Sequence, residues 1–252
     1  MRPDRVTLRG IWGTAPRHPL SHTGVMITMF LNEEAQMAHI VLLGDSIFDN
    51  APYVPAGTEV QSQLQARLGP QHRVSLLARD GDVLADMVAQ VGRLQELPEP
   101  ADWLLVSCGG NDVLGLVGAM QSRVNSVLEA AELLASWQAG FRCDYRRMLD
   151  VVLATKRPVA VATIYDSVPG LAPGLRTALA PFNDVILRAA VECHLPVLDL
   201  RLICDEAADY AVSSPIEPST QGGHKIATAI AELVLAHDPI APKTVVYAGA
   251  SR

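Results

Sequence analysis

Five short apolar runs alternate with segments of helical periodicity, and this alternation restricts the chain to a small set of folds. The runs occupy residues 40–43, 74–78, 103–108, 159–164 and 196–200. The first is too short and too rich in branched residues for a helix, so it predicts a strand buried on both faces. Parallel neighbours need crossover connections. We therefore expect an α/β fold in which helices cover both faces of a five-stranded parallel sheet.

The helical segments lie between these runs. Residues 58–68 and 84–94 show apolar residues at helical spacing. The long region that ends near residue 156 is also helical in pattern. We expect it to contribute two or three helices, and we expect a break near residues 135–140. We expect the last helix to open at Glu217-Pro218-Ser219, with Pro218 in its first position, because the N–H that proline lacks has no helical partner there.

The length and composition of the chain allow one substantial core. Of the 252 residues, 49% are hydrophobic and 19% are charged. We find no internal repeat and expect a single domain over residues 38–238. Residues 1–37 show no sustained periodicity and are predicted to form a disordered leader, and residues 239–252 are predicted to form a loose tail.

The charge and the cysteine spacing exclude several classes of partner. The net charge of -7 and the pI near 5.5 give no attraction for a phosphate backbone, so nucleic acid is not expected. The four cysteines form no C-x-x-C pair, and we expect no metal, cofactor or disulfide. A cytoplasmic location fits best. The apolar stretch at residues 24–31 is too short to span a bilayer, and export by a degenerate signal stays open.

Three polar turns follow the first three predicted strands. Gly44-Asp45 leads to Ser46, a second turn contains Gly81, and a third contains Asn111. Taken singly, each is also typical of an ordinary strand-ending turn. Because parallel strands place their carboxyl ends at one sheet edge, we expect the three turns to converge there. The N–H groups of Ser46 and Gly81 and the amide of Asn111 can then serve as oxyanion donors for acyl transfer.

These turns, in this order, resemble the motifs of the SGNH hydrolase family, also called GDSL-like lipases and esterases. The similar region spans residues 39–237 and includes Leu43-Gly44-Asp45-Ser46, Gly81, Gly109-Gly110-Asn111-Asp112, Asn183 and Asp199. The resemblance implies a flavodoxin-like three-layer α/β/α sandwich. It also implies that Ser46 is the nucleophile and that Ser46, Gly81 and Asn111 form the oxyanion hole. We expect Asp45 and Asp112 to support their loops through backbone hydrogen bonds.

The chain departs from this family in the block that usually reads Asp-x-x-His. Alignment on Pro218-Ser219 places Glu217 at the histidine position and Ser214 at the aspartate position. His224 lies about 10 Å farther along the predicted helix and is expected to point elsewhere. The other six histidines precede strands or lie in peripheral segments, and we interpret them as surface or structural residues. They are His18, His22, His39, His72, His194 and His237.

Two interpretations of Glu217 stay open. Burial beside the oxyanion donors would raise its pKa toward the working range of a general base. Alternatively, its carboxylate only favours the positive end of the last helix.

The sequence therefore predicts a serine hydrolase of carboxylic esters or acetylated small molecules, with a Ser46 acyl-enzyme and Glu217 in place of histidine. The alternative is a binding protein that kept the oxyanion pocket and lost turnover. A nucleotide binder is a weaker third hypothesis, because no phosphate loop or G-x-G-x-x-G fingerprint occurs. Substrate choice is expected to depend on the loops at residues 49–57, 115–120 and 165–174.

Overall fold

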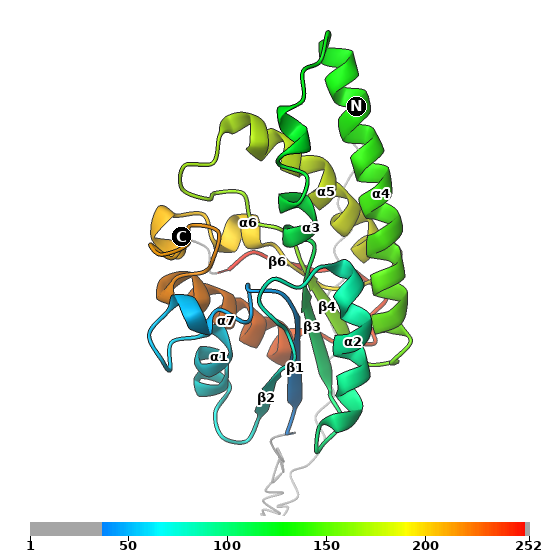
Figure 1. Ribbon diagram of the computed structural model, residues 1–252. Helices are drawn as coiled ribbons and strands as arrows, with labels where there is room; N and C mark the ends of the chain where they lie inside the picture. The colour runs from blue at the N-terminus through cyan, green and yellow to red at the C-terminus, as the bar shows by residue number, and fades with distance from the viewer. Residues whose placement is uncertain (1–36, 250–252) are drawn as a thin grey trace, which may run out of the picture. The chain divides into compact units, whose positions relative to one another are not determined.

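Six parallel strands form the sheet in the computed structural model, which describes residues 37–249 (Figure 1). The strands are β1 (His39–Gly44), β2 (Arg73–Leu76), β3 (Trp103–Ser107), β4 (Val159–Ala162), β5 (Val197–Leu198) and β6 (Val246–Tyr247). Their order is β2-β1-β3-β4-β5-β6. The order reverses between β1 and β3, and open α/β sheets bind ligands outside the strand ends at such a switch point.

The five predicted strands are confirmed, but the predicted strand count is one too low. The additional strand, β6, comes from residues 239–252, which were predicted to form a loose tail. Val197 aligns with Val246, and the N–H of Val197 donates to the carbonyl of Val245 at 2.9 Å. A strand of only two residues carries too little periodicity to be recognised without its neighbour. The predicted leader, residues 1–37, lies outside the described residues except for Met37.

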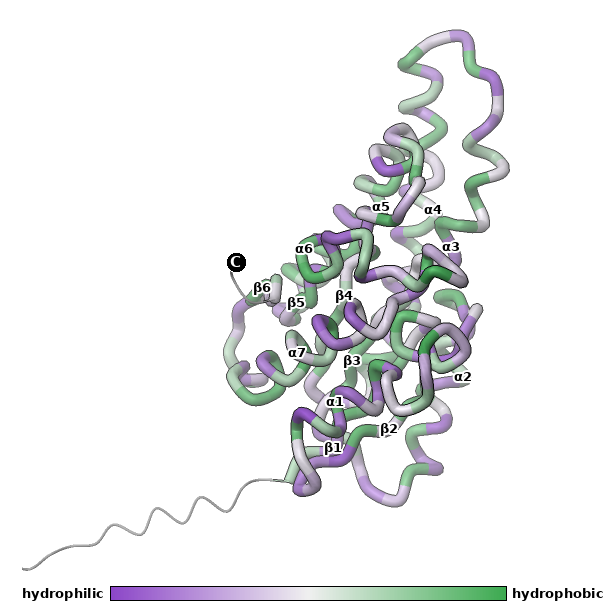
Figure 2. The backbone as a smooth tube through the Cα atoms, turned by 90° about the vertical axis from the view of Figure 1, so that its left-hand side faces the viewer, coloured by the Kyte–Doolittle hydropathy of each residue, from purple (hydrophilic) through white to green (hydrophobic). Residues whose placement is uncertain are grey.

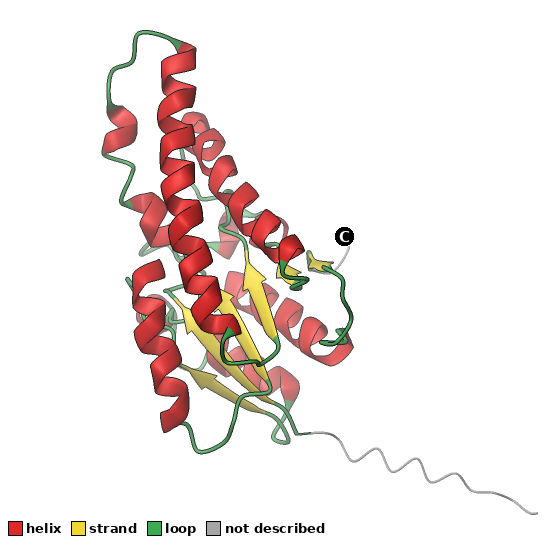
Figure 3. Ribbon diagram, turned by 90° about the vertical axis from the view of Figure 1, so that its right-hand side faces the viewer, coloured by secondary structure: helices red, strands yellow, loops and turns green. Residues whose placement is uncertain are grey.

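Helices cover both faces of the sheet, as the α/β prediction requires. Along β1, Val41 and Leu43 belong to the core cluster under α2 and α4, whereas Ile40 and Leu42 belong to the cluster under α1 and α7. All four side chains are fully buried. Successive residues of a strand point to opposite faces, so this run must be apolar throughout. The view in Figure 3 shows the sheet between its two helical layers.

Seven α-helices and five short 3₁₀ helices lie within residues 37–249. The α-helices are α1 (Val60–Leu68), α2 (Met87–Gly92), α3 (Gly110–Leu114), α4 (Val127–Leu153), α5 (Pro173–Glu192), α6 (Leu200–Ile203) and α7 (Thr220–Ala236). The 3₁₀ helices are η1 (Ala51–Tyr53), η2 (Leu84–Asp86), η3 (Arg93–Glu96), η4 (Ala119–Gln121) and η5 (Ala207–Asp209). None of these helices is long and apolar enough to cross a bilayer.

Two predicted helix boundaries are wrong. The break expected at residues 135–140 is absent, and α4 continues for 27 residues because Phe141 and Tyr145 anchor it in the core. The last helix does not begin at Pro218. It begins at Thr220, because the hydroxyl of Ser219 accepts hydrogen bonds from the second and third N–H groups of α7 and caps it.

Part of the helical layer extends past the carboxyl ends of the strands (Figures 1 and 3). We call this part the arm, and define it as η4, residues 122–140 and residues 172–179. Its main parts are the first half of α4 and the first turns of α5. The arm stands beside the sheet edge at which the three predicted turns lie.

Candidate active site

Ser46 follows a turn that only glycine permits. Gly44 ends β1 with a φ of +128°, and a Cβ atom added there would lie 1.8 Å from the carbonyl oxygen of Ser107. The two strands therefore approach each other closely, and the N–H of Asp45 donates to that oxygen at 3.1 Å. The Ser46 side chain is nearly buried, with 6% of its surface exposed. The turn fixes Ser46 at the switch point between β1 and β3.

Asp45 supports this turn through backbone contacts, as predicted. Its Oδ1 accepts a hydrogen bond from the N–H of Ile47 at 3.2 Å, and its carbonyl accepts from Phe48 and Asp49 at 3.1 Å. Burial is the main cause that raises the pKa of Asp45 to about 8; the charges of Glu217 and Asp112 also raise it, and the hydrogen bond from Ile47 opposes the rise. A buried carboxyl group next to Ser46 thus keeps its proton near neutral pH.

Asn111 reaches the cavity at Ser46 from the turn that follows β3. Gly109, with a φ of +116°, precedes α3, and Asn111 lies in the first turn of that helix. The Asn111 Nδ2 donates to the carbonyl of Asp82 at 2.9 Å, and its second amide hydrogen has no acceptor within residues 37–249. Asp112 supports the same junction as predicted, because its Oδ2 accepts from the N–H of Leu84 at 3.1 Å.

Gly81 lies in the neighbouring turn, with a φ of +85° and an exposed surface. It is not among the residues that line the cavity at Ser46. The turn that contains it is nevertheless fixed, because Asp49 Oδ2 accepts from the N–H of Asp80 at 2.9 Å. Among the described residues, no group accepts a hydrogen bond from the N–H of Gly81 or of Ser46. Both N–H groups are therefore available to a ligand.

The sequence did not identify Gln90, which connects the turns of Gly44 and Gly81. The side chain of this buried residue in α2 accepts from the N–H of Gly44 at 2.8 Å and donates to the carbonyl of Gly44 at 2.7 Å. Its Nε2 also donates to Asp82 Oδ2 at 2.7 Å. The available signal was a polar residue within the apolar pattern of residues 84–94, but its partners are distant in sequence.

Glu217 also reaches the cavity, although it does not begin the last helix. It lies three residues before α7 and has 4% of its surface exposed. The pKa of Glu217 is raised to about 7, mainly by burial. A hydrogen-bonding interaction with the Ser46 side chain opposes the rise, and the charge of Asp80 contributes to it. Its Oε2 atom is buried and has no hydrogen-bond partner among the described residues. Glu217 is therefore buried beside Ser46 and lies outside α7, which begins three residues later.

Tyr165 fixes the position of Ile216, the residue before Glu217, through a hydrogen bond. This buried tyrosine follows β4, and its hydroxyl donates a hydrogen bond to the carbonyl of Ile216. Backbone contacts complete the turn, since the N–H of Glu217 donates to Ser214 at 3.0 Å and its carbonyl accepts from Ala211 at 2.8 Å. The sequence did not predict the role of Tyr165, because the contact spans 51 residues of the chain.

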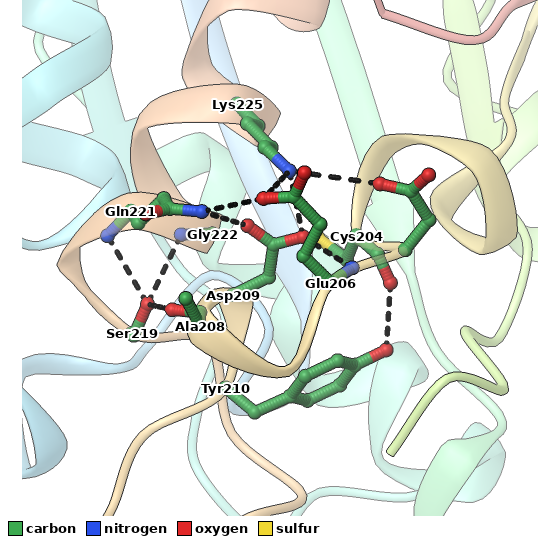
Figure 4. Close-up of polar contacts among 10 residues, drawn as sticks. Cys204, Glu206, Ala208, Asp209, Tyr210, Ser219, Gln221, Gly222 and Lys225 are labelled. Atoms are coloured by element: carbon green, nitrogen blue, oxygen red, sulfur yellow. Dashed lines mark hydrogen bonds and ion pairs between the residues drawn. The ribbon is translucent and has the colours of Figure 1, made fainter. Parts of the chain in front are cut away.

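A polar cluster around Asp209 holds the same segment against α7 (Figure 4). Asp209 is fully buried, and its carboxylate accepts from Lys225 Nζ at 2.8 Å and from Gln221 Nε2 at 3.0 Å. The carbonyl of Asp209 accepts from the N–H of Ser219 at 2.8 Å. Gly222 allows the close approach, since a Cβ atom there would lie 2.1 Å from that carbonyl. These contacts fix the chain on both sides of Glu217.

No histidine within residues 37–249 lines the cavity. His224 is exposed and its Nε2 contacts Arg67 at 3.2 Å. His39 is buried at the opposite end of β1, with Ser75 and Glu99 as partners at 2.8 and 3.1 Å. The prediction that these histidines are surface or structural residues agrees with their positions. His18 and His22 lie outside the described residues.

Asn183 and Asp199, which also fit the family pattern, are structural residues here. The Asn183 side chain accepts from the N–H of Ile164 and donates to its carbonyl, both at 2.8 Å. Asp199 contacts Arg201 at 2.6 Å and Thr163 at 3.0 Å. Both residues stabilise the chain where it leaves the sheet.

One cavity brings together Ser46, Asn111 and Glu217, which come from three different turns. Its remaining wall is mostly aliphatic and includes residues of α3, the segment after β4 and the start of α5. The aliphatic residues include Val113, Val117, Val168, Leu171, Leu175 and Leu179. The geometry supplies a hydroxyl, a carboxyl group and an amide at one end of an apolar cavity.

Comparison with known proteins gives one family and a set of solved structures. The model of the GDSL-like lipase/acylhydrolase family matches residues 42–224. No match was found among curated proteins.

The similar structures share the fold at low sequence identity. A lipolytic protein of the G-D-S-L family from Veillonella parvula has a TM-score of 0.60 at 18% identity, covering 79% of this chain and 100% of that chain. A variant of an acetyl xylan esterase from Geobacillus stearothermophilus has 0.54 at 19% identity, covering 82% and 96%. A psychrotrophic esterase from Pseudoalteromonas, inhibited by monoethylphosphonate, has 0.54 at 14% identity, covering 78% and 96%. Because the family model spans most of the chain, this protein belongs to the GDSL-like lipase/acylhydrolase family of ester hydrolases.

Proposed function

We propose that this protein hydrolyses carboxylic esters or acetylated small molecules through a Ser46 acyl-enzyme, with Glu217 as the general base. Glu217 takes the proton from Ser46 Oγ while the oxygen attacks the ester carbonyl. The tetrahedral intermediate then collapses, the C–O bond to the alcohol breaks, and the protonated Glu217 returns its proton to the leaving alcohol. In the second half of the cycle Glu217 deprotonates a water molecule that attacks the acyl carbonyl. The bond to Ser46 Oγ then breaks, and the protonated Glu217 returns its proton to Ser46 as the acid leaves.

The observation that carries this proposal is the position of Glu217. Its carboxyl group is buried next to Ser46 and its pKa is raised to about 7. A general base works best when its pKa lies near the working pH, and an ordinary glutamate is too weak a base for this role. The buried setting thus gives Glu217 the proton affinity that a histidine has in its usual environment.

Three donors support the oxyanion in this proposal. The N–H groups of Ser46 and Gly81 and the second amide hydrogen of Asn111 have no acceptor among the described residues. Ser46 and Asn111 line the cavity, whereas Gly81 belongs to the adjoining turn. We assign Gly81 as the outermost donor of the three.

A binding protein with the same pocket is the second candidate. It is favoured by the absence of histidine from the cavity lining within residues 37–249. In that case Glu217 only completes the polar end of a ligand pocket, and Ser46 performs no covalent chemistry.

Labelling with a serine-reactive phosphonate tests the proposal. The wild-type protein is expected to gain one phosphonyl group on Ser46, as located by peptide mass spectrometry, and Ser46→Ala is expected to gain none. Labelling that persists in Ser46→Ala would remove Ser46 as the nucleophile. A folded wild-type protein that takes no label would favour the binding protein.

A further inference from the structure

The three proposed oxyanion donors lie on three separate turns, and one buried side chain connects these turns. Ser46 follows β1, Gly81 follows β2 and Asn111 follows β3. The ladders between these strands end before the donors, so strand pairing does not set the distances between them. α2 is mostly hydrophobic (Figure 2), and Gln90, its one polar side chain, has 2% of its surface exposed. A buried amide needs hydrogen-bond partners, and Gln90 finds them in the polar turns.

The partners of Gln90 fix the orientation of its amide. Its Oε1 accepts from the N–H of Gly44 at 2.8 Å, and its Nε2 donates to the carbonyl of Gly44 and to Asp82 Oδ2, both at 2.7 Å. The N–H can only donate, and the carbonyl and the carboxylate can only accept. The amide oxygen must therefore face the N–H, and both amide hydrogens are used. Methionine, which is similar in length, supplies neither donor.

Each proposed donor is close to a group that Gln90 binds. Ser46 comes two residues after Gly44, and Gly81 directly precedes Asp82. Asn111 Nδ2 donates to the carbonyl of Asp82 at 2.9 Å. The positions of all three donors thus depend on two residues that one side chain holds together.

We propose that Gln90 is a positioning residue that sets the spacing of the three oxyanion donors. It does not line the cavity at Ser46, and it acts through Gly44 and Asp82. A donor stabilises an oxyanion only from hydrogen-bonding distance of the place where the charge develops, so a change in spacing slows the reaction. This inference rests on the proposed function, since it assumes that the donors meet an oxyanion. It goes beyond that function because it assigns a catalytic consequence to a residue outside the cavity.

Gln65 in α1 provides a matched control. Its side chain accepts from the N–H of Val74 at 2.9 Å and donates to the carbonyls of Gly69 and His72 at 3.0 and 2.9 Å. Gln90→Met and Gln65→Met therefore each remove one accepted and two donated hydrogen bonds. The contacts of Gln65 hold the turn that enters β2, at the opposite end of the sheet from the donors. Steady-state kinetics on an ester such as p-nitrophenyl butanoate, at a temperature at which both variants are folded, measures kcat and KM.

We expect Gln90→Met to lower kcat by about 10²-fold, the usual cost of misplacing a catalytic group by about 1 Å. Its KM should stay near the wild-type value, because the donors act on the transition state. Gln65→Met is expected to keep both constants near the wild-type values, although it also loses stability. Ser46-dependent hydrolysis with an unchanged kcat in Gln90→Met, or with an equal fall in Gln65→Met, would overturn the positioning role and leave the proposed function standing.

Asp82 supplies a second test that does not require Gln90→Met to fold. Asp82→Ala removes one acceptor of Gln90, and Asp86→Ala, the control, removes an acceptor of the Val83 N–H at 2.9 Å. Only Asp82→Ala is expected to lower kcat, by about tenfold, and its effect should not add to that of Gln90→Met because both break one network. A wild-type kcat in Asp82→Ala, or effects that multiply in the double variant, would contradict the network.

A spectroscopic measurement separates this inference from the proposed function. Asn111 binds Asp82, and Asp82 binds Gln90, so the ¹H–¹⁵N resonances of the Asn111 side-chain amide report the donor position without any reaction. These resonances are expected to shift in Gln90→Met and to stay in place in Gln65→Met. This result would support the positioning role even if the wild type hydrolysed no ester and the proposed function failed. Unchanged Asn111 resonances in Gln90→Met would contradict it.

Discussion

Two carboxyl groups next to Ser46 have pKa values raised by burial, to about 8 for Asp45 and about 7 for Glu217. They differ in what they contact. Asp45 accepts a backbone hydrogen bond within its own turn, whereas one oxygen of Glu217 has no partner within the described residues. Asp45 is therefore suited to hold the turn, and Glu217 is suited to exchange a proton with the serine.

Asn111→Ala is expected to lower kcat by about 10²- to 10³-fold, the usual cost of losing one oxyanion donor. The change in KM should be small, because the donor interacts best with the charge of the transition state. Steady-state kinetics on an ester that the wild type hydrolyses measures both constants. An unchanged kcat would remove Asn111 from the oxyanion hole.

Asp45→Asn is expected to make the stability of the protein depend less on pH between about pH 4 and pH 8. In the folded protein Asp45 keeps its proton up to about pH 8, whereas in the unfolded chain it loses it near pH 4. Between these values the folded state binds more protons, so wild-type stability falls as the pH rises. Asparagine retains the acceptor for Ile47 and has no charge to bury.

The measurement for this prediction is the melting temperature from pH 5 to pH 9. The Asp45→Asn curve should be flatter than that of the wild type, and Asp150→Asn, a change at an exposed residue of α4, should follow the wild type. Parallel curves for Asp45→Asn and the wild type would show that this carboxyl group does not titrate as proposed.

At the scale of elements, the loop after β4 contacts the segment before α7 through the hydroxyl of Tyr165, which donates a hydrogen bond to Ile216. Tyr165→Phe removes the donor to the Ile216 carbonyl, and Tyr210→Phe removes a donor to the Cys204 carbonyl at 2.8 Å. The two rings lie 4.9 Å apart, so the variants are matched in position and size. Each is expected to lower the free energy of unfolding by about 1 to 3 kcal/mol.

Only Tyr165→Phe is expected to change the kinetics. Release of the Glu217 segment should lower kcat/KM by about tenfold, equivalent to about 1.4 kcal/mol, and move the midpoint of its pH profile. Tyr165 acts here as a positioning residue, because its hydroxyl acts through the Ile216 carbonyl. Equal kinetic effects of Tyr165→Phe and Tyr210→Phe would reduce this role to general stability.

The sequence predicted the features that arise from local pattern and missed those that depend on distant contacts. The buried runs and the turns at Gly44 and Gly109 follow from a few neighbouring residues, and they placed Ser46 and Asn111 at one sheet edge. Gln90 and Tyr165 make their contacts over 46 and 51 residues, which no local pattern encodes. The same reason explains β6, which pairs with β5 at the edge of the sheet formed by the described residues.

At the scale of the whole molecule, the end of the chain is expected to contribute to stability. Deletion of residues 240–252 removes β6, including backbone hydrogen bonds from Val197 to Val245 and from Asp199 to Tyr247, both 2.9 Å long. Two such bonds are worth about 1 kcal/mol each, and the loss of packing by Tyr247 adds to this. Thermal unfolding should show a lower melting temperature, whereas an unchanged one would mean that β6 is a loose tail after all.

The central claim is that Glu217 activates Ser46 as a nucleophile. The most direct measurement is the rate at which a phosphonate labels Ser46 as a function of pH, in the wild type and in Glu217→Gln. Glu217 accepts a proton only when ionised, and its pKa is raised to about 7, so the wild-type rate should rise through about pH 7 and then level off. Glu217→Gln should label about 10²- to 10⁴-fold more slowly, without that rise. Labelling of Ser46 at the same rate and with the same pH profile in both proteins would contradict the claim.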